Sequence, residues 1–220
     1  MKKNLSFSIV LLLAIGAAGL SGCATRADPA TLYDLGPLRA EPAVSNTTAD
    51  TTAGSSSGSP AALTRPPALS VAEVNAPAWL DSPLMFFRLS YANDQQPRAY
   101  ANSRWTMAPA QLFGQRLKSR LAQAGGIVLP AADGAANVPL LRIEADDFTQ
   151  TFDSPAHSSA RIALRATVFN ARTMTAQKTF VKQVPAPSAD AAGGARALAE
   201  ASDALIADMI VWLAVLPLPK

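Results

Sequence analysis

The residues with the most distinctive chemistry stand near the N-terminus, where Leu20, Ser21 and Gly22 precede the only cysteine of the chain, Cys23. A thiol is nucleophilic enough to take a diacylglycerol group as a thioether, and cleavage in front of it frees an amine for a further acyl chain. Two lysines and then a short apolar run over residues 5–16 precede this motif, in the order typical of a signal peptide. We therefore predict that Leu20, Ser21 and Gly22 form the signal peptidase recognition site and that Cys23 carries S-diacylglycerol and N-acyl groups.

The apolar run also bears on how the protein is held at a membrane. A membrane-spanning helix needs about 20 apolar residues, and this run is shorter, so we interpret residues 1–22 as a cleaved signal peptide. Each buried methylene contributes ~0.8 kcal/mol, so the acyl chains on Cys23 would hold the protein firmly on a membrane. Because Ala24 and not aspartate follows Cys23, the sorting behaviour of bacterial lipoproteins predicts the periplasmic face of the outer membrane.

The composition argues against several other functions. Removal of residues 1–22 takes away two of the 19 basic residues and none of the 16 acidic residues, so the mature chain is nearly balanced in charge. No block of Lys and Arg of the kind that follows phosphates remains, which argues against nucleic-acid binding. A lipidated Cys23 leaves no thiol for a disulfide, and one histidine without a free cysteine leaves no zinc site. We expect no metal and no cofactor beyond the covalent lipid.

The remaining candidates for catalysis are His157 and the adjacent acids Asp146 and Asp147. A hydrolase needs a nucleophile, a base and an orienting group, and His157 stands in a Ser- and Pro-containing turn without a motif of defined spacing. Adjacent residues on a regular strand face opposite ways, so the two acids could share a proton only if a bulge turned them together. We interpret all three as solvated side chains and predict no catalytic residues.

Composition also divides the mature chain into segments. Residues 23–31 are predicted to form a lipidated tether, and the alternation in residues 32–38 indicates a first strand. Residues 39–67 consist mainly of Ala, Thr, Ser, Gly and Pro, which cannot offset the entropy of ordering a chain. We therefore expect a disordered low-complexity linker or loop insertion there, followed by a folded domain over residues 68–218.

Hydrophobic periodicity predicts the elements of this domain. Apolar runs or alternation indicate strands over 68–76, 84–90, 127–129, 160–168 and 177–184, and helical spacing indicates amphipathic helices over 109–124 and 190–216. In a further strand over 141–152 the alternation changes phase at Asp146 and Asp147, which a β-bulge would explain. The elements together predict an α+β fold with a mixed, largely antiparallel β-sheet and two amphipathic helices packed on one face.

Three large side chains, Trp79, Arg104 and Trp105, are candidates for a partner interface. Trp and Arg dominate the energetics of binding interfaces. Large apolar side chains are also common in protein cores, so packing of Trp105 under the helix that begins near Pro109 is the alternative interpretation.

Several short motifs follow one another in a characteristic order. They are Leu32-Tyr33-Asp34-Leu35, then Leu69-Ser70-Val71-Ala72-Glu73-Val74 running to Pro77, Trp79-Leu80-Asp81-Ser82-Pro83, Phe86-Phe87-Arg88, and Arg104-Trp105 ahead of the first helix. In these motifs the chain resembles the ABC-type transport auxiliary lipoproteins, the family that includes paraquat-inducible protein C. The resemblance implies a mixed sheet with two helices on one face, in which residues 32–35 form the first strand and residues 39–67 a loop insertion.

The same resemblance implies a function. Relatives of this kind serve transport systems built on MCE-domain proteins, which carry phospholipids or other lipids across the periplasm. We expect a non-catalytic component that docks a periplasmic MCE-domain protein at the outer membrane, alone or as a homo-oligomeric ring, with an inner-membrane permease and ATPase as further partners. A lipoprotein that helps to assemble or plug an outer-membrane β-barrel is the alternative, and an envelope hydrolase that depends on His157 is a third interpretation.

Overall fold

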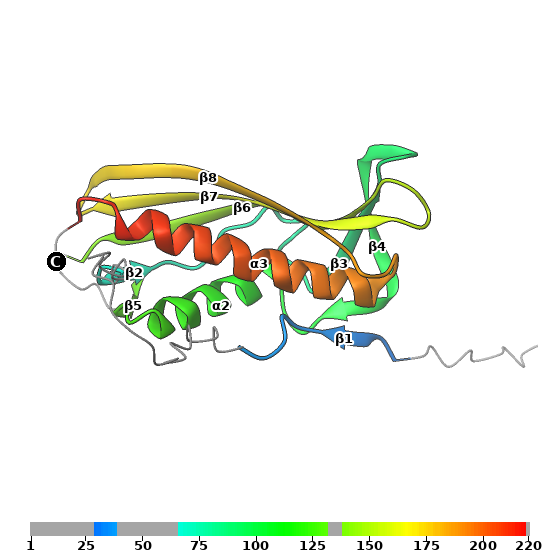
Figure 1. Cartoon of the computed structure of the whole chain (residues 1–220), viewed down its shortest axis with the longest axis horizontal. Helices are drawn as coiled ribbons and strands as arrows, with labels where there is room; N and C mark the ends of the chain where they lie inside the picture. Colours follow the sequence, from blue (N-terminus) through cyan, green and yellow to red (C-terminus); the bar gives the residue numbers. More distant parts are fainter. Residues whose placement is uncertain (1–28, 39–65, 132–137, 219–220) are drawn as a thin grey trace, which may run out of the picture.

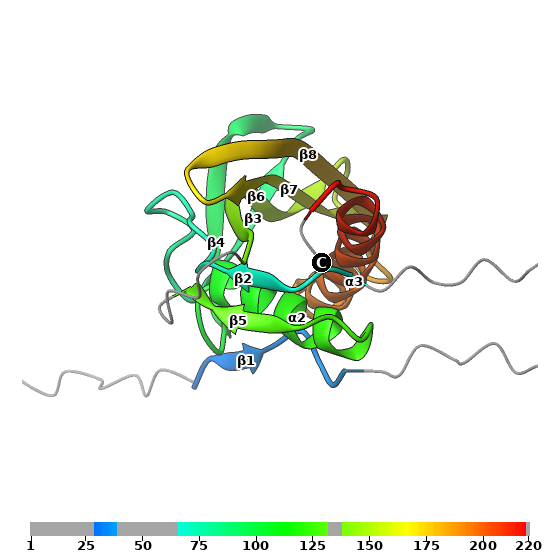
Figure 2. The same ribbon diagram turned by 90° about the vertical axis from the view of Figure 1, so that its left-hand side faces the viewer.

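The computed structural model describes residues 29–38, 66–131 and 138–218. Within these residues the chain forms one sheet of eight strands, β1 to β8, and two helices, α2 and α3. The sheet curls strongly, and both helices lie on the same side of it (Figures 1 and 2). The predicted α+β class, with a mixed sheet and two helices on one face, is confirmed.

Three long strands form an antiparallel meander. They are β6 (Leu140–Phe152), β7 (Ser158–Asn170) and β8 (Thr173–Pro185). The pairing of β6 with β7 skips one residue between Ala145 and Asp147, so Asp146 is an extra residue in β6 and the predicted β-bulge is confirmed. Among the described residues β8 pairs only with β7, so it is an edge strand of this sheet.

The other edge of β6 carries two short parallel strands, one after the other. β2 (Leu69–Val71) pairs with the first residues of β6, and β3 (Leu84–Leu89) pairs with its last residues. β5 (Val128–Pro130) continues the sheet beyond β2, whereas β4 (Asn93–Trp105) and then β1 (Thr31–Tyr33) continue it beyond β3. The sheet therefore branches at β6, and its two arms turn around the helices.

Both helices carry the terminal signals that their sequences contain. Pro109 is the first residue of α2 (Pro109–Gln123), and Gly125, with a φ of +82°, follows the end of that helix. Asp190 caps α3 (Ala191–Ala214), because its carboxylate accepts a hydrogen bond of 2.7 Å from the backbone N–H of Gly193. Within the described ranges, neither helix combines the length and the apolarity that a membrane crossing requires.

The hydrophobic core lies between the sheet and the two helices. Its fully buried members include Trp105 at the end of β4, Phe113 and Leu117 of α2, and Leu198 and Leu205 of α3. These large side chains belong to one densely packed cluster, in which Trp105 of β4 packs edge to face on Phe148 of β6. The end of β4 is thereby tied to the core of the domain.

The structure differs from the sequence-based expectation most clearly at β4, for which periodicity predicts no strand. Nearly all side chains of Asn93–Trp105 are exposed until Trp105 is reached, so the segment lacks the alternating apolar signal of a half-buried strand. The strand predicted over 68–76 is also shorter. β2 ends at Val71, and around the exposed Glu73 the chain no longer pairs with β6. Pairing with β6 resumes only as a single bridge between Asn75 and Glu144.

A strand does form around Leu32, because β1 pairs in parallel with the end of β4, but it covers only Thr31–Tyr33 and not the predicted residues 32–38. The predicted signal peptide, the lipid attachment site Cys23 and residues 39–65 of the predicted linker lie outside the described residues.

Candidate interaction surfaces

His157 lies in the turn between β6 and β7 and is exposed. Its Nδ1 atom is 3.1 Å from the hydroxyl oxygen of Ser154, which also accepts a 3.1 Å hydrogen bond from the backbone N–H of His157. The serine therefore stabilises the turn through two local contacts. In the part of the chain that the structure describes, no group of three His, Cys, Asp or Glu side chains is arranged to hold a metal ion.

The two adjacent acids have different surroundings. Asp146, the extra residue of the bulge, is exposed. Asp147 accepts a hydrogen bond of 2.8 Å from the hydroxyl of Thr149, and its carboxylate lies 3.3 Å from the guanidinium of Arg161 on the neighbouring strand. Asp147 thus stabilises the β6–β7 pair.

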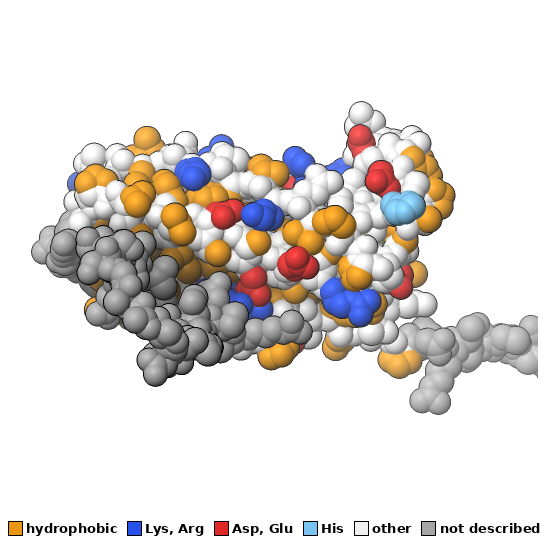
Figure 3. Space-filling model, viewed as in Figure 1, with side chains coloured by type: hydrophobic (Ala, Val, Ile, Leu, Met, Phe, Trp, Pro, Cys, Tyr) orange, Lys and Arg blue, Asp and Glu red, His pale blue; other side chains and the backbone are white. Residues whose placement is uncertain are grey.

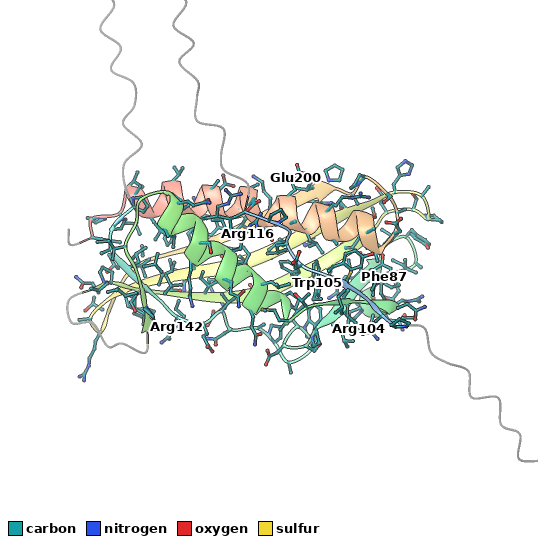
Figure 4. All side chains as sticks on the ribbon, turned by 90° about the horizontal axis from the view of Figure 1, so that it is seen from below. Phe87, Arg104, Trp105, Arg116, Arg142 and Glu200 are labelled. Atoms are coloured by element: carbon teal, nitrogen blue, oxygen red, sulfur yellow. The ribbon has the colours of Figure 1, made fainter. Side chains whose placement is uncertain are left out.

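Trp105 and Arg104 are neighbours in sequence but not in environment. The side chain of Trp105 is 1% exposed and packs edge to face with Phe148, with ring centroids 5.8 Å apart. It is a core residue, and its indole offers no surface to a partner. Arg104 is half-buried on the other face of β4, where its guanidinium donates to the backbone carbonyls of Tyr100 and Ser103. Figure 4 shows both residues near the point where the chain enters β1.

A mixed apolar and basic patch lies on the outer side of β1, β3 and β4, and we call it the β1 face. Leu32 and Leu84 both lie opposite Arg104 across the sheet, so these three side chains share one face. Leu32 is 63% exposed. Phe86 and Arg88 follow Leu84 at alternate positions of β3, and Trp79 contacts both, so we include these three residues in the β1 face. Trp79 and Phe86 are partly buried and also pack against the core.

Trp79 is held on the β1 face by two ring contacts. Its ring packs edge-on against Phe86 with centroids 5.3 Å apart, and the guanidinium carbon of Arg88 lies 5.5 Å from the centre of the Trp79 ring. Among the described residues, no ion pair joins Arg88 or Arg104 to a carboxylate. No described carboxylate therefore neutralises the positive charge of these two arginines by direct pairing.

An ion-pair network fastens β1 to the two helices. Arg116 of α2 donates to both carboxylate oxygens of Asp203 of α3, over 2.8 and 2.7 Å, and to the carbonyl of Gly36 just after β1, over 2.9 Å. Burial raises the pKa of the Asp203 carboxyl, but hydrogen bonds and charges from Arg116 and Arg120 outweigh this effect, so the net pKa lies below its usual range. The network keeps the segment after β1 in place; Figure 4 labels Arg116 on α2.

A second polar contact joins β4 to the meander. The hydroxyl of Tyr100 donates to Gln150 Oε1 over 2.8 Å, and Gln150 Nε2 donates to the hydroxyl of Ser158 over 2.8 Å. Burial, followed by smaller contributions from Asp190 and Tyr33, raises the pKa of the Tyr100 hydroxyl. Tyr100 therefore remains a neutral donor, and the contact fixes the exposed β3–β4 hairpin to β6 and β7.

Exposed apolar side chains gather at the other end of the molecule. Val211 and Val215, in and just after the last turn of α3, are 69% and 73% exposed. Met174 is also exposed, just after the β7–β8 turn, and this turn lies at the same end of the molecule as the end of α3 (Figure 1). We call Val211, Val215 and Met174 the far-end patch; Figure 3 shows apolar side chains gathered over β8 and the end of α3.

Residues 50–210 match the model of the ABC-type transport auxiliary lipoprotein component, which is more than half of the chain. The chain belongs to this family. The resemblance inferred from the short motifs is therefore confirmed. The matched region of this auxiliary lipoprotein includes Trp79, Arg88 and Arg104, whereas β1 and Cys23 precede it.

Solved structures share the fold of this auxiliary lipoprotein. Protein XCC0632 from Xanthomonas campestris, labelled DUF330, is 19% identical with a TM-score of 0.63, and the match covers 71% of this chain and 89% of that protein. A second, uncharacterized protein is 14% identical with a TM-score of 0.60, over 84% of this chain and 99% of its own. No curated protein matches the sequence significantly. At these identities the solved structures bear on the fold alone.

Membership in a lipoprotein family indicates a membrane-anchored auxiliary component of an ABC-type transport system. Of the three surface candidates found in the sequence, the structure brings Trp79 and Arg104 to one face and places Trp105 in the core. Sequence analysis did not single out Arg116 and Asp203, which are 87 positions apart. No local motif could have shown that these two residues meet.

Proposed function

We propose that this auxiliary lipoprotein is a non-catalytic accessory component of an MCE/ABC-type phospholipid transport system, anchored through Cys23 at the periplasmic face of the outer membrane. Its role is to dock a periplasmic MCE-domain protein there, while an inner-membrane permease and ATPase supply the energy. The observation that carries the proposal is the family match over residues 50–210. The sequence contains no Walker motif, which agrees with an energy source outside this chain.

The arrangement of the two candidate surfaces supports this role. The chain that leads from Cys23 enters the domain at the start of β1, and the far-end patch lies at the opposite end of the long axis (Figure 1). An anchored protein of this shape can keep one end at the membrane and present the other to the periplasm. Exposed apolar side chains gathered at one end of a domain can mark a protein interaction site, so we assign the docking of the MCE-domain protein to the far-end patch.

Photo-crosslinking in cells tests this assignment. A photoreactive amino acid at Val215 should crosslink to the MCE-domain protein, and the same amino acid at the exposed Arg98, on the β3–β4 hairpin, serves as the matched control. We expect the crosslink from position 215 and none from position 98. A crosslink from position 215 to an outer-membrane β-barrel protein would instead favour the assembly or plug alternative. Absence of any crosslink at 215 would contradict docking at the far-end patch.

A further inference from the structure

We propose that the β1 face lies on the surface of the bilayer, with Leu32 and Trp79 at the level of the lipid headgroups and Arg88 and Arg104 against anionic phosphates. This inference rests on the proposed lipid anchor at Cys23 and specifies which side of the domain the anchor brings to the membrane. The occupant of the face is thus a phospholipid surface and not a protein partner.

The chain between the proposed lipid anchor and β1 is short enough to keep β1 near the membrane. Five residues separate Cys23 from Pro29, the first described residue. A fully extended chain covers at most about 3.3–3.6 Å per residue, so Pro29 stays within roughly 20 Å of the lipidated residue. By comparison, the 24 residues of α3 span about 36 Å. The start of β1 is therefore always close to the membrane, whereas the far end of α3 can lie well away from it.

The apolar and aromatic side chains of the β1 face suit the boundary between lipid headgroups and acyl chains. Leu32 lies one residue after the start of β1 and is 63% exposed, which is unfavourable in water and favourable at the boundary of the acyl chains. Trp79 presents a half-buried ring whose amphipathic character suits the headgroup region. Leu84 and Phe86 continue the apolar surface between them.

The charges of the face are complementary to a bilayer that contains anionic lipid. Arg88 and Arg104 reach the same surface, and neither forms an ion pair with a carboxylate of the described residues. Hydrogen bonds to the backbone carbonyls of Asp94, Tyr100 and Ser103 hold the two guanidinium groups but leave their charge intact. A basic residue near an anionic surface contributes about 1 kcal/mol, which corresponds to roughly a fivefold change in the contact equilibrium.

The β1 face is also held rigid enough to act as a unit. The carbonyl of Gly36 is fixed by Arg116, and Trp105, on the reverse side of β4 from Arg104, is buried in the core. The anchor therefore pulls on a strand that is fastened to both helices, and the strand cannot turn its outer side away independently of the domain.

Depth-dependent quenching on vesicles tests the proposal with the mature, acylated protein. Acylation blocks the only native thiol, so Leu32→Cys and the control Val181→Cys, exposed on the outer side of the edge strand β8, each introduce one reactive site. Each is labelled with a fluorophore and bound to vesicles of phosphatidylethanolamine and phosphatidylglycerol that contain a headgroup-level nitroxide lipid. We expect quenching at position 32 to be several-fold stronger than at position 181.

The arginine contribution is tested in the Leu32→Cys protein. Combining it with Arg88→Gln and Arg104→Gln should lower the contact equilibrium about fivefold for each arginine removed, whereas Arg172→Gln in the exposed β7–β8 turn should leave it unchanged. Equal quenching at positions 32 and 181 in acylated, vesicle-bound protein would overturn the proposal and leave the anchor intact. Protection of position 32 from both the lipid quencher and aqueous iodide would also overturn it, by showing that a second copy or another protein covers the face. A purified protein whose mass shows no acyl groups would instead refute the anchor and the inference together.

Discussion

The ion pair between Arg116 of α2 and Asp203 of α3 gives the most specific prediction about stability. We expect Asp203→Asn to destabilise the domain by about 2–3 kcal/mol. Removing one partner of a buried ion pair costs about 3–5 kcal/mol because the other charge stays buried. The Arg116 side chain is only 6% exposed, but Asp203 is 30% exposed. Water can therefore partly replace the lost carboxylate, and we expect a cost below the full range, about 2–3 kcal/mol.

Urea denaturation followed by circular dichroism measures this free energy directly, and a thermal scan should show a fall in Tm of roughly 5 to 10 °C for a chain of this size. Asp208→Asn on the same helix is the matched control. Asp208 is 58% exposed and pairs with Lys182 at the surface, so its loss should cost less than about 1 kcal/mol. If the two variants differed by less than about 0.5 kcal/mol, the reasoning about the buried guanidinium would be wrong.

The pH dependence follows from the lowered pKa of Asp203. A carboxyl whose pKa is lower in the folded than in the unfolded protein contributes its full stabilisation above the unfolded value, ~3.9 for aspartate. The contribution is lost as the pH falls through the lower folded value. The difference in stability between wild type and Asp203→Asn should thus stay constant from about pH 7 to 5 and shrink below about pH 4.

Three further predictions concern the start of α3 and the anchor. Gly193→Ala places a Cβ 2.1 Å from the carbonyl oxygen of Ser188, so the backbone must shift. We expect the free energy of unfolding, measured by urea denaturation, to fall by about 1–3 kcal/mol. Unchanged stability would show that the loop around Ser188 moves without cost. Asp190→Ala removes the helix cap and should cost about 0.5–2 kcal/mol, whereas Asp190→Ser should restore most of it. Cys23→Ser should remain unprocessed or leave the outer-membrane fraction, and full processing with normal sorting of this variant would refute the lipoprotein interpretation of the N-terminus.

The parts of the fold that were predictable are those with one buried face. Strand β7 buries its apolar side chains against the helices and turns Arg161 and Arg165 to solvent, and this alternation is legible in the sequence. The change of phase in the apolar alternation around Asp146 likewise corresponds to the β-bulge in β6. Strand β4 was not predictable, because its backbone pairs with β3 while most of its side chains remain in water.

The candidate surfaces were predictable only in part. We assign Trp79 and Arg104 to one face, but the sequence does not show that β1 brings Leu32 opposite Arg104. Trp105 follows Arg104 directly, and adjacent residues on a strand face opposite ways, so one of the two had to point inward. Which of them does so depends on the packing of β4 against Phe148 of β6, and this is a tertiary contact.

We propose that this auxiliary lipoprotein works as part of an MCE-type transport system. Affinity purification of the tagged, lipidated protein from mildly solubilised envelopes, with mass spectrometry of the bound proteins, is the decisive test. We expect recovery of an MCE-domain protein together with its permease and ATPase. Recovery of an outer-membrane β-barrel protein alone, or of no partner, would contradict it.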